Sequence, residues 1–108
     1  MQLPRDCVLL RIFVGESERD GHSPLYEAIV MKAKEFGLAG ATVLRGPLGF
    51  GRSSRIHSAK ILRLSEDLPM VIEIVDETAK VQSFLDQHGA MLGNGLVTLE
   101  KVQVIQYG

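Results

Sequence analysis

The chain has 108 residues, of which 45% are hydrophobic and 23% charged, so it can form a core and is not expected to be disordered. This length predicts a single domain over residues 1–108. The formal net charge of −1 argues against binding of DNA or RNA through a global positive field. No apolar run approaches the ~20 residues that cross a bilayer, and no secretory signal begins the chain. We therefore expect a cytoplasmic protein without direct membrane insertion, in agreement with the single cysteine, Cys7.

The first half of the chain predicts a strand, a helix and a second strand. Cys7–Val14 is a continuous β-rich apolar run. Ser23 followed by Pro24 is a helix start signal, with Ser23 as the N-cap and Pro24 at the first helical position. Gly37 lies where a helix-ending residue of left-handed conformation is expected. β character resumes over residues 41–44.

The second half repeats this order after a long loop. Residues 61–64 are β-like, and Met70–Val75 predicts a further strand. Asp76 is expected to cap a helix over Glu77–His88. Leu96–Tyr107 then predicts a long last strand.

Two β-α-β halves predict an α+β fold, the ferredoxin-like βαββαβ sandwich, with the first and third strands central and a long loop between the halves. Alternation along these strands gives one face to the helices. The other face would carry Leu9, Phe13, Val71 and Val75 around Arg11 and Glu73. Because such an apolar patch is unusual on a solvated monomer, we expect it to lie between subunits, unless the register is shifted by one residue.

The loop Arg45–His57 is the most distinctive segment, with three glycines, three arginines, two serines and one histidine. Arginine forks match phosphate or carboxylate, and glycine lets the backbone approach a ligand. The tight Gly93–Gly95 turn could add a nest of backbone N–H groups. The predicted ligand-binding residues are Arg45, Gly46, Gly49, Phe50, Gly51, Arg52, Ser53, Ser54, Arg55, His57, Gly93, Asn94 and Gly95.

Both segments also have a purely structural interpretation. Arg45–His57 would then be a solvated loop tip, and Gly93–Gly95 an ordinary tight turn. No pair of carboxylates has catalytic spacing, so we expect no catalytic residues. The three histidines and Cys7 are widely separated, so we expect no metal site and no required cofactor.

These residues resemble the nitrogen-regulatory PII proteins. Arg45–His57, which contains Gly49–Arg52, is similar to the start of the PII T-loop. Residues 68–75 are similar to the third PII strand, 92–97 to the B-loop, and 35–43 to the turn before the T-loop. The resemblance is closer still to a small PII-like family, through Gly15–Ser17, Pro24–Glu27, Gly37–Val43, Arg45–Gly46, Gly49–Gly51, Ser54–His57 and Leu64–Pro69.

The resemblance implies a homotrimer that binds an adenine nucleotide between subunits and engages a target protein, such as a transporter or channel, through the 45–58 loop. Three departures from PII weigh against ATP and 2-oxoglutarate. Leu96 replaces a basic B-loop residue, Ser53 replaces a glutamine, and residues 102–108 lack the basic side chains of the PII C-terminus. A mononucleotide or cyclic nucleotide would require fewer cations.

The sequence therefore predicts a regulatory ligand-binding protein rather than an enzyme. Two alternatives stay open: a small ferredoxin-like enzyme acting on a phosphate or carboxylate substrate, and a structural oligomerisation domain.

Overall fold

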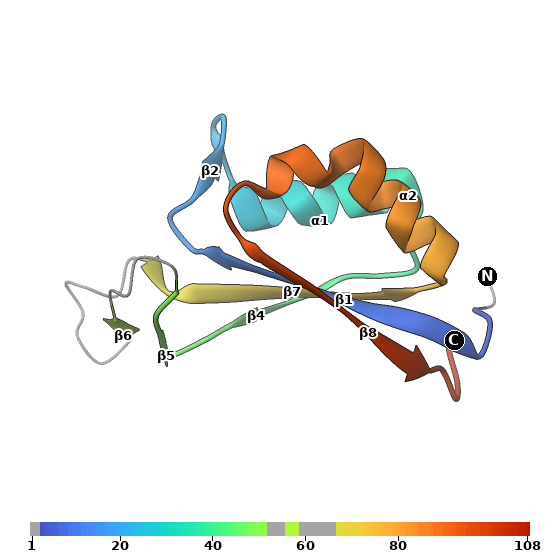
Figure 1. Ribbon diagram of the computed structural model, residues 1–108. Coiled ribbons are helices and arrows are strands. Elements are labelled where there is room, and N and C mark those ends of the chain that lie inside the picture. Colours follow the sequence, from blue (N-terminus) through green and yellow to red (C-terminus); the bar gives the residue numbers. More distant parts are fainter. Residues whose placement is uncertain (1–2, 52–55, 59–66) are drawn as a thin grey trace.

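A four-stranded antiparallel sheet with two helices on one face forms the body of the molecule (Figure 1). The structure is a computed structural model that describes residues 3–51, 56–58 and 67–108. The sheet order is β4-β7-β1-β8, so the first and third long strands are central and the predicted α+β ferredoxin-like sandwich is confirmed. The elements of this sandwich are β1 (Asp6–Gly15), α1 (Leu25–Phe36), β4 (Thr42–Arg45), β7 (Pro69–Asp76), α2 (Thr78–His88) and β8 (Leu96–Gln103).

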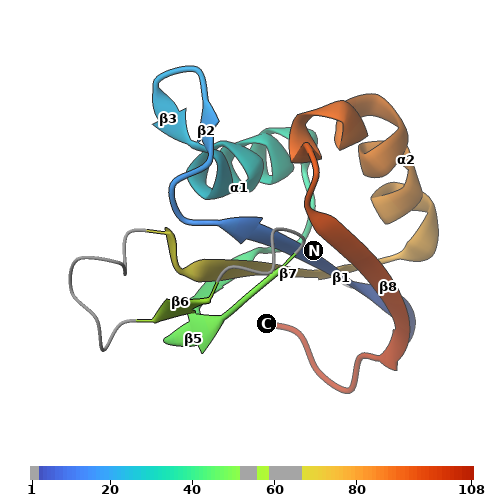
Figure 2. The same ribbon diagram turned by 60° about the vertical axis from the view of Figure 1, so that its left-hand side comes forward.

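Short strands and a 3-10 turn lie in the segments that connect the long strands and helices. They are β2 (Arg19–Asp20) with β3 (Ser23–Pro24), β5 (Leu48–Gly49) with β6 (His57–Ser58), and a 3-10 turn at Gly89–Leu92. The β5–β6 ribbon projects beyond one end of the sheet (Figure 2). The β-like residues 61–64 fall outside the described part of the chain.

Alternating apolar residues place the core between the sheet and the helices. In β1 and β7 every second side chain is buried, and these residues contact Leu25, Ile29 and Ala33 of α1 and Val81 and Phe84 of α2. Non-polar side chains that repeat every second residue along a strand lie on one face, which is why the predicted register holds. The buried strand residues are Val8, Leu10, Ile12, Val14, Met70, Ile72 and Ile74.

The other sheet face, which we call the open face, is covered by no helix of the described residues. Cross-strand pairing aligns an apolar row on it, one residue from each strand: Leu44, Val71, Phe13 and Leu96. The edge residues of this row, Leu44 and Leu96, are 51% and 61% exposed. Single exposed apolar residues are normal on proteins, but an aligned row across a whole sheet is typical of a surface that another molecule covers.

A row of polar residues follows the apolar row on the open face. Arg11 Nε donates to Glu73 Oε2 at 2.9 Å, and Arg11 Nη1 donates to Glu100 Oε1 at 3.1 Å. The hydrogen bond to Glu73 raises the pKa of Arg11 further above its ordinary value. Arg11 and Glu73, both expected on this face, therefore form an ion pair within one chain.

Both predicted helix caps are wrong. Ser23 pairs with Asp20 in the β2–β3 ribbon, and Pro24 is the N-cap of α1. The first helical N–H, that of Leu25, instead donates to the carbonyl of Glu18 at 2.7 Å. Asp76 ends β7, and α2 begins one residue later than predicted, with Glu77 as its N-cap. Gly37 ends α1 in the left-handed conformation, with φ 93°, as predicted.

The last strand is shorter than predicted. It ends at Gln103, and the N–H of Val104 donates to the carbonyl of Arg5 at 2.7 Å. The chain then leaves the ladder and turns onto the open face.

Asp76 is the buried charged residue that joins the two halves of the described chain. Its side chain is 1% exposed and accepts hydrogen bonds from the N–H of Ala39 at 2.9 Å and of Glu77 at 2.7 Å, while Lys80 Nζ lies 3.7 Å from Oδ2. We expect Asp76→Ala to lower the free energy of unfolding in urea by about 2–4 kcal/mol, because two backbone donors lose their acceptor.

The matched control for this prediction is Asp86→Ala, which removes an exposed carboxylate that accepts from Gln82 on α2. It should change stability by less than about 0.5 kcal/mol. Equal unfolding midpoints for the two variants would show that the buried Asp76 carboxylate stabilises the fold no more than the exposed Asp86 carboxylate.

Candidate functional site

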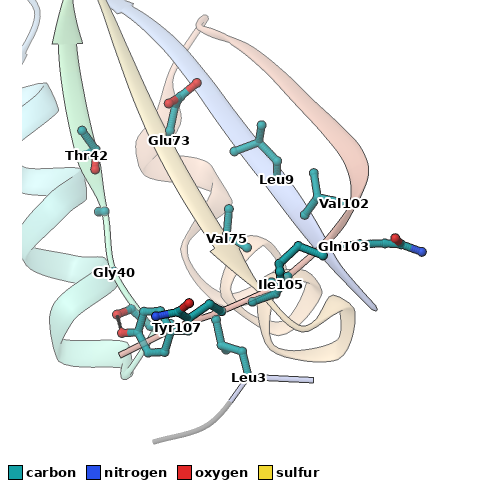
Figure 3. A pocket seen from close by; sticks show the side chains of 14 residues that line it. Leu3, Leu9, Gly40, Thr42, Glu73, Val75, Val102, Gln103, Ile105 and Tyr107 are labelled. Atoms are coloured by element: carbon teal, nitrogen blue, oxygen red, sulfur yellow. Dashed lines mark hydrogen bonds between the residues drawn. The ribbon is translucent and has the colours of Figure 1, made fainter. Parts of the chain in front are cut away.

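A pocket of about 600 Å³ lies on the open face at the end of the sheet where β1 begins (Figure 3). Its floor is apolar and consists of Leu9, Val75 and Val102 from three adjacent strands. The α1–β4 turn forms one side through Ala39, Gly40 and Ala41. An apolar cavity of this size with a few polar groups is typical of a small-molecule site.

Two polar side chains from the strands reach this pocket. Thr42 and Glu73 lie opposite each other in the β4–β7 ladder. The Glu73 carboxylate already accepts from Arg11, which fixes its orientation. The Thr42 hydroxyl adds a donor and acceptor at the margin of the apolar floor.

A segment that we call the strap, Val104–Gly108, runs past the sheet on the side away from the helices (Figure 2), and its residues Val104–Tyr107 line the pocket. It leaves the end of β8 at the hydrogen bond between Val104 and Arg5. Tyr107 at its far end donates its hydroxyl hydrogen bond to the carbonyl of Ala39 at 2.5 Å. The strap therefore spans the face from the β8 edge to the turn before β4.

Arg45, the first predicted anion-binding residue, ends β4 and is held by a carboxylate. Its Nη2 donates to Glu16 Oε1 at 3.1 Å, and its Nε lies 3.1 Å from Oε2. This two-point ion pair orients the guanidinium at the base of the long loop. An anion that binds Arg45 must share it with Glu16.

Gly46 and Gly49 pack on the ring of Pro69. A Cβ atom at either position would lie 2.9 or 3.0 Å from Pro69 Cγ, which is too close for an ordinary contact. The N–H of Gly46 also donates to the carbonyl of Pro69 at 2.8 Å. Close packing thus explains these two glycines whether or not a ligand binds there.

The rest of the long loop is described in part. Phe50 is 68% exposed, and no atom of the described residues lies within 4 Å of the Cβ position of Gly51. His57 pairs with Gly49 in the β5–β6 ribbon, which brings one predicted histidine beside one predicted glycine. The predicted residues Arg52, Ser53, Ser54 and Arg55 lie outside the described residues.

The Gly93–Gly95 turn leads from the 3-10 turn into β8. Gly93 has φ +62°, a left-handed conformation that favours glycine. A Cβ on Gly95 would lie 2.5 Å from the carbonyl oxygen of Phe13. Each glycine therefore has a local structural reason, and Asn94 lies between them at the surface.

The two loops lie at the same end of the sheet but on opposite edges. Arg45 ends the β4 edge strand, and Gly95 precedes the β8 edge strand. Three strand spacings separate these edges, about 14 Å. A small ligand cannot be held by both loops of one chain, whereas the β4 edge of one subunit and the β8 edge of another could meet.

Sequence reasoning missed the pocket and the strap because their residues come from five separate segments and are mostly apolar. The available signal was Thr42 and Glu73, polar residues in strands that otherwise read as apolar. Among the described residues, no group of three His, Cys, Asp or Glu side chains is placed to hold a metal ion. Burial raises the pKa of the Cys7 thiol above its ordinary value, and the nearby Asp76 and Glu77 add to this shift, so the thiol stays protonated.

The fold is that of the PII-like proteins. CPII from Thiomonas intermedia K12, a nitrogen regulatory PII-like protein bound to ADP, AMP and bicarbonate, superposes with a TM-score of 0.68 and 16% identity. The superposition covers 94% of this chain and 90% of CPII. A second structure of CPII, bound to ADP and bicarbonate, gives a TM-score of 0.65 over the same shares. The resemblance predicted from the loop, turn and strand motifs is confirmed at the level of the fold.

Residues 7–104 match the family DUF190, described as "Uncharacterized ACR, COG1993", and the chain belongs to this family. A UPF0166 protein of Aquifex aeolicus is 44% identical over 97 residues, which cover 90% of this chain and 91% of the relative. A second UPF0166 protein of that organism is 37% identical over 90% of this chain and 95% of its own length. The UPF0166 protein MJ1524 of Methanocaldococcus jannaschii is 30% identical over 89% of each chain.

Proposed function

We propose that this protein is a PII-like regulatory protein that binds an adenine nucleotide between subunits and signals to a target protein through the 45–58 loop. The observation that carries the proposal is the pocket beside Thr42, at the start of the strand whose other end is Arg45. The neighbouring fold CPII, bound to ADP and AMP, supports an adenine nucleotide as the ligand.

The adenine base fits the apolar floor of the pocket. Leu9, Val75 and Val102 offer non-polar contacts to a flat ring, and the Thr42 hydroxyl offers a hydrogen bond to a ring nitrogen or amino group. Three residue steps of extended chain, about 10 Å, lead along β4 from Thr42 to the base of the long loop at Arg45, whose own side chain alternates to the other face. This distance is comparable with the length of a mononucleotide, so the phosphate would lie beside the long loop.

The phosphate would be bound by residues of two subunits. In one chain Arg45, Arg52, Arg55 and the loop backbone supply donors, and the Gly93–Gly95 turn of a neighbour supplies N–H groups. The separation of the two loops on opposite sheet edges supports a shared site. We expect AMP or a cyclic nucleotide to bind better than ATP, because few cations are available in these segments.

The assembly we propose is a homotrimer that buries the open face. The apolar row of Leu44, Val71, Phe13 and Leu96 supports this arrangement, since it crosses all four strands and is partly exposed in the single chain. Contacts between subunits along this row would bring a β4 edge and a β8 edge together at each ligand site.

In this proposal the 45–58 loop is the element whose conformation changes during signalling. A nucleotide that contacts Arg52 or Arg55 in one loop state stabilises that state through its own contacts. The target, for example a transporter or channel, would bind one state of the loop, and we expect this exchange to take place in the cytoplasm. In the part of the chain that the structure describes, no helix combines the length and apolar character needed to cross a membrane.

Isothermal titration calorimetry tests the proposal. The wild-type protein is titrated with AMP, cyclic AMP, ADP and ATP, with and without magnesium and with and without bicarbonate. We expect saturable binding of at least one adenine nucleotide. The proposal fails if no adenine nucleotide gives saturable heat at millimolar concentration.

Thr42→Val tests the placement of the base, because it keeps the shape of the side chain and removes its hydroxyl. Losing a hydrogen bond of about 0.5–1.5 kcal/mol should weaken AMP binding roughly two- to twelvefold. Thr98→Val is the matched control, since Thr98 lies on the same face of β8 but does not line the pocket. Equal affinities for the two variants would place the base elsewhere.

A further inference from the structure

The strap leaves the pocket unfilled. It is attached by the Val104 N–H at one end and by the Tyr107 hydroxyl at the other. Between these points a space of about 600 Å³ remains between the strap and the sheet. Ile105 is 83% exposed and Tyr107 is 47% exposed, although both line the pocket. Two side chains of this kind at the margin of an apolar pocket gain contacts when a flat apolar group enters it.

From these observations we propose that the strap is a lid that closes over the adenine base, with Tyr107 as its latch. The inference rests on the proposed nucleotide site and assigns to that site residues that neither loop contains. Ile105 and Tyr107 supply the wall opposite Leu9 and Val75 (Figure 3). The Tyr107 hydroxyl fixes this wall to the carbonyl of Ala39, one of the residues that form the side of the pocket.

A lid of this kind affects the rate at which the base leaves the pocket more than the rate at which it binds. A ligand can occupy the existing space without displacing the strap, so the strap does not compete with the base. Entry and release follow the same path, so both require the strap to move, and a bound base that contacts Ile105 and Tyr107 makes that movement less favourable. The strap therefore lowers the dissociation rate, and its loss should raise that rate more than it changes the association rate.

Tyr107→Phe tests the latch, because it keeps the ring and removes the hydroxyl. We expect the dissociation constant for AMP to rise, by at most about twelvefold, because the hydrogen bond already holds the strap in the free chain and its loss lowers the fraction of chains that are ready to bind. A variant that ends at Gln103 removes the whole strap and should weaken AMP binding by about tenfold or more. Tyr26→Phe, on α1 and away from the pocket, is the matched control and should bind AMP like the wild type.

Hydrogen exchange of residues 104–107 provides a second readout that does not depend on a variant. These amides should exchange more slowly when AMP is bound. If the wild type binds AMP but Tyr107→Phe and the shortened chain bind equally well, the lid is overturned and the nucleotide site stands. Tighter binding by the shortened chain would also overturn the lid, because the strap would then be a competitor. If the wild type binds no adenine nucleotide, the proposed function and the lid both fail.

Discussion

Phe13→Asp is expected to convert the proposed trimer into monomers. Phe13 lies in the middle of the apolar row, paired with Val71 on one side and Leu96 on the other. An unpaired charge buried between subunits costs about 3–5 kcal/mol. Each 1.4 kcal/mol is a tenfold change in an equilibrium constant, so the assembly should weaken by about two to three and a half orders of magnitude per contact. Light scattering at micromolar concentration measures this directly as a fall in molar mass.

Two further variants separate assembly from folding. Leu44→Asp places the same charge at a position that is already 51% exposed in the single chain, so the subunit should fold normally while the assembly is lost. Met31→Asp changes an exposed residue of α1, away from the open face, and should remain trimeric. A stable wild-type monomer, or a trimeric Leu44→Asp variant, would show that the open face is not the interface.

Replacing both Arg52 and Arg55 by alanine is expected to weaken nucleotide binding about a hundredfold or more. Charge-assisted hydrogen bonds contribute roughly 1.5–3 kcal/mol each, so each arginine that contacts phosphate accounts for about tenfold or more. Each single variant should weaken AMP binding about tenfold. Calorimetry with AMP gives these dissociation constants, and circular dichroism checks that the fold is retained.

The control for the double variant must remove the same charge elsewhere. Arg19→Ala with Lys34→Ala does so on β2 and on the last turn of α1. This control should bind AMP within about twofold of the wild type, since screening at physiological salt limits the effect of distant surface charges. Wild-type affinity in the Arg52 and Arg55 double variant would mean that the phosphate lies elsewhere.

The sheet could be predicted from the sequence because a strand repeats every two residues. The alternation of Leu10, Ile12, Ile72 and Ile74 with Arg11 and Glu73 defined both faces and their register. The helix starts could not be predicted in the same way, because a residue caps a helix only if its side chain is not engaged by other contacts. Ser23 is drawn into a ribbon with Asp20, and the Asp76 carboxylate also accepts from Ala39, which is distant in sequence.

The sequence pointed to candidate loops for a binding site but not to the pocket. Glycines and arginines are concentrated between Arg45 and His57, so that loop was visible in the sequence. Leu9, Val75 and Ile105 carry no such signal, since an apolar residue in a strand looks the same whether it lines the core or a cavity. The strap was read as strand because Val104 and Ile105 are β-formers, yet Val104 bonds to Arg5 and ends the ladder.

The packing of Gly46 and Gly49 on one proline ring fixes the start of the long loop. Any swing that began before Gly49 would have to lift both glycines from Pro69 and break the hydrogen bond from the Gly46 N–H. The four residues from Gly46 to Gly49 are therefore held against Pro69 at the base of the long loop, and this packing fixes the direction in which the chain leaves β4.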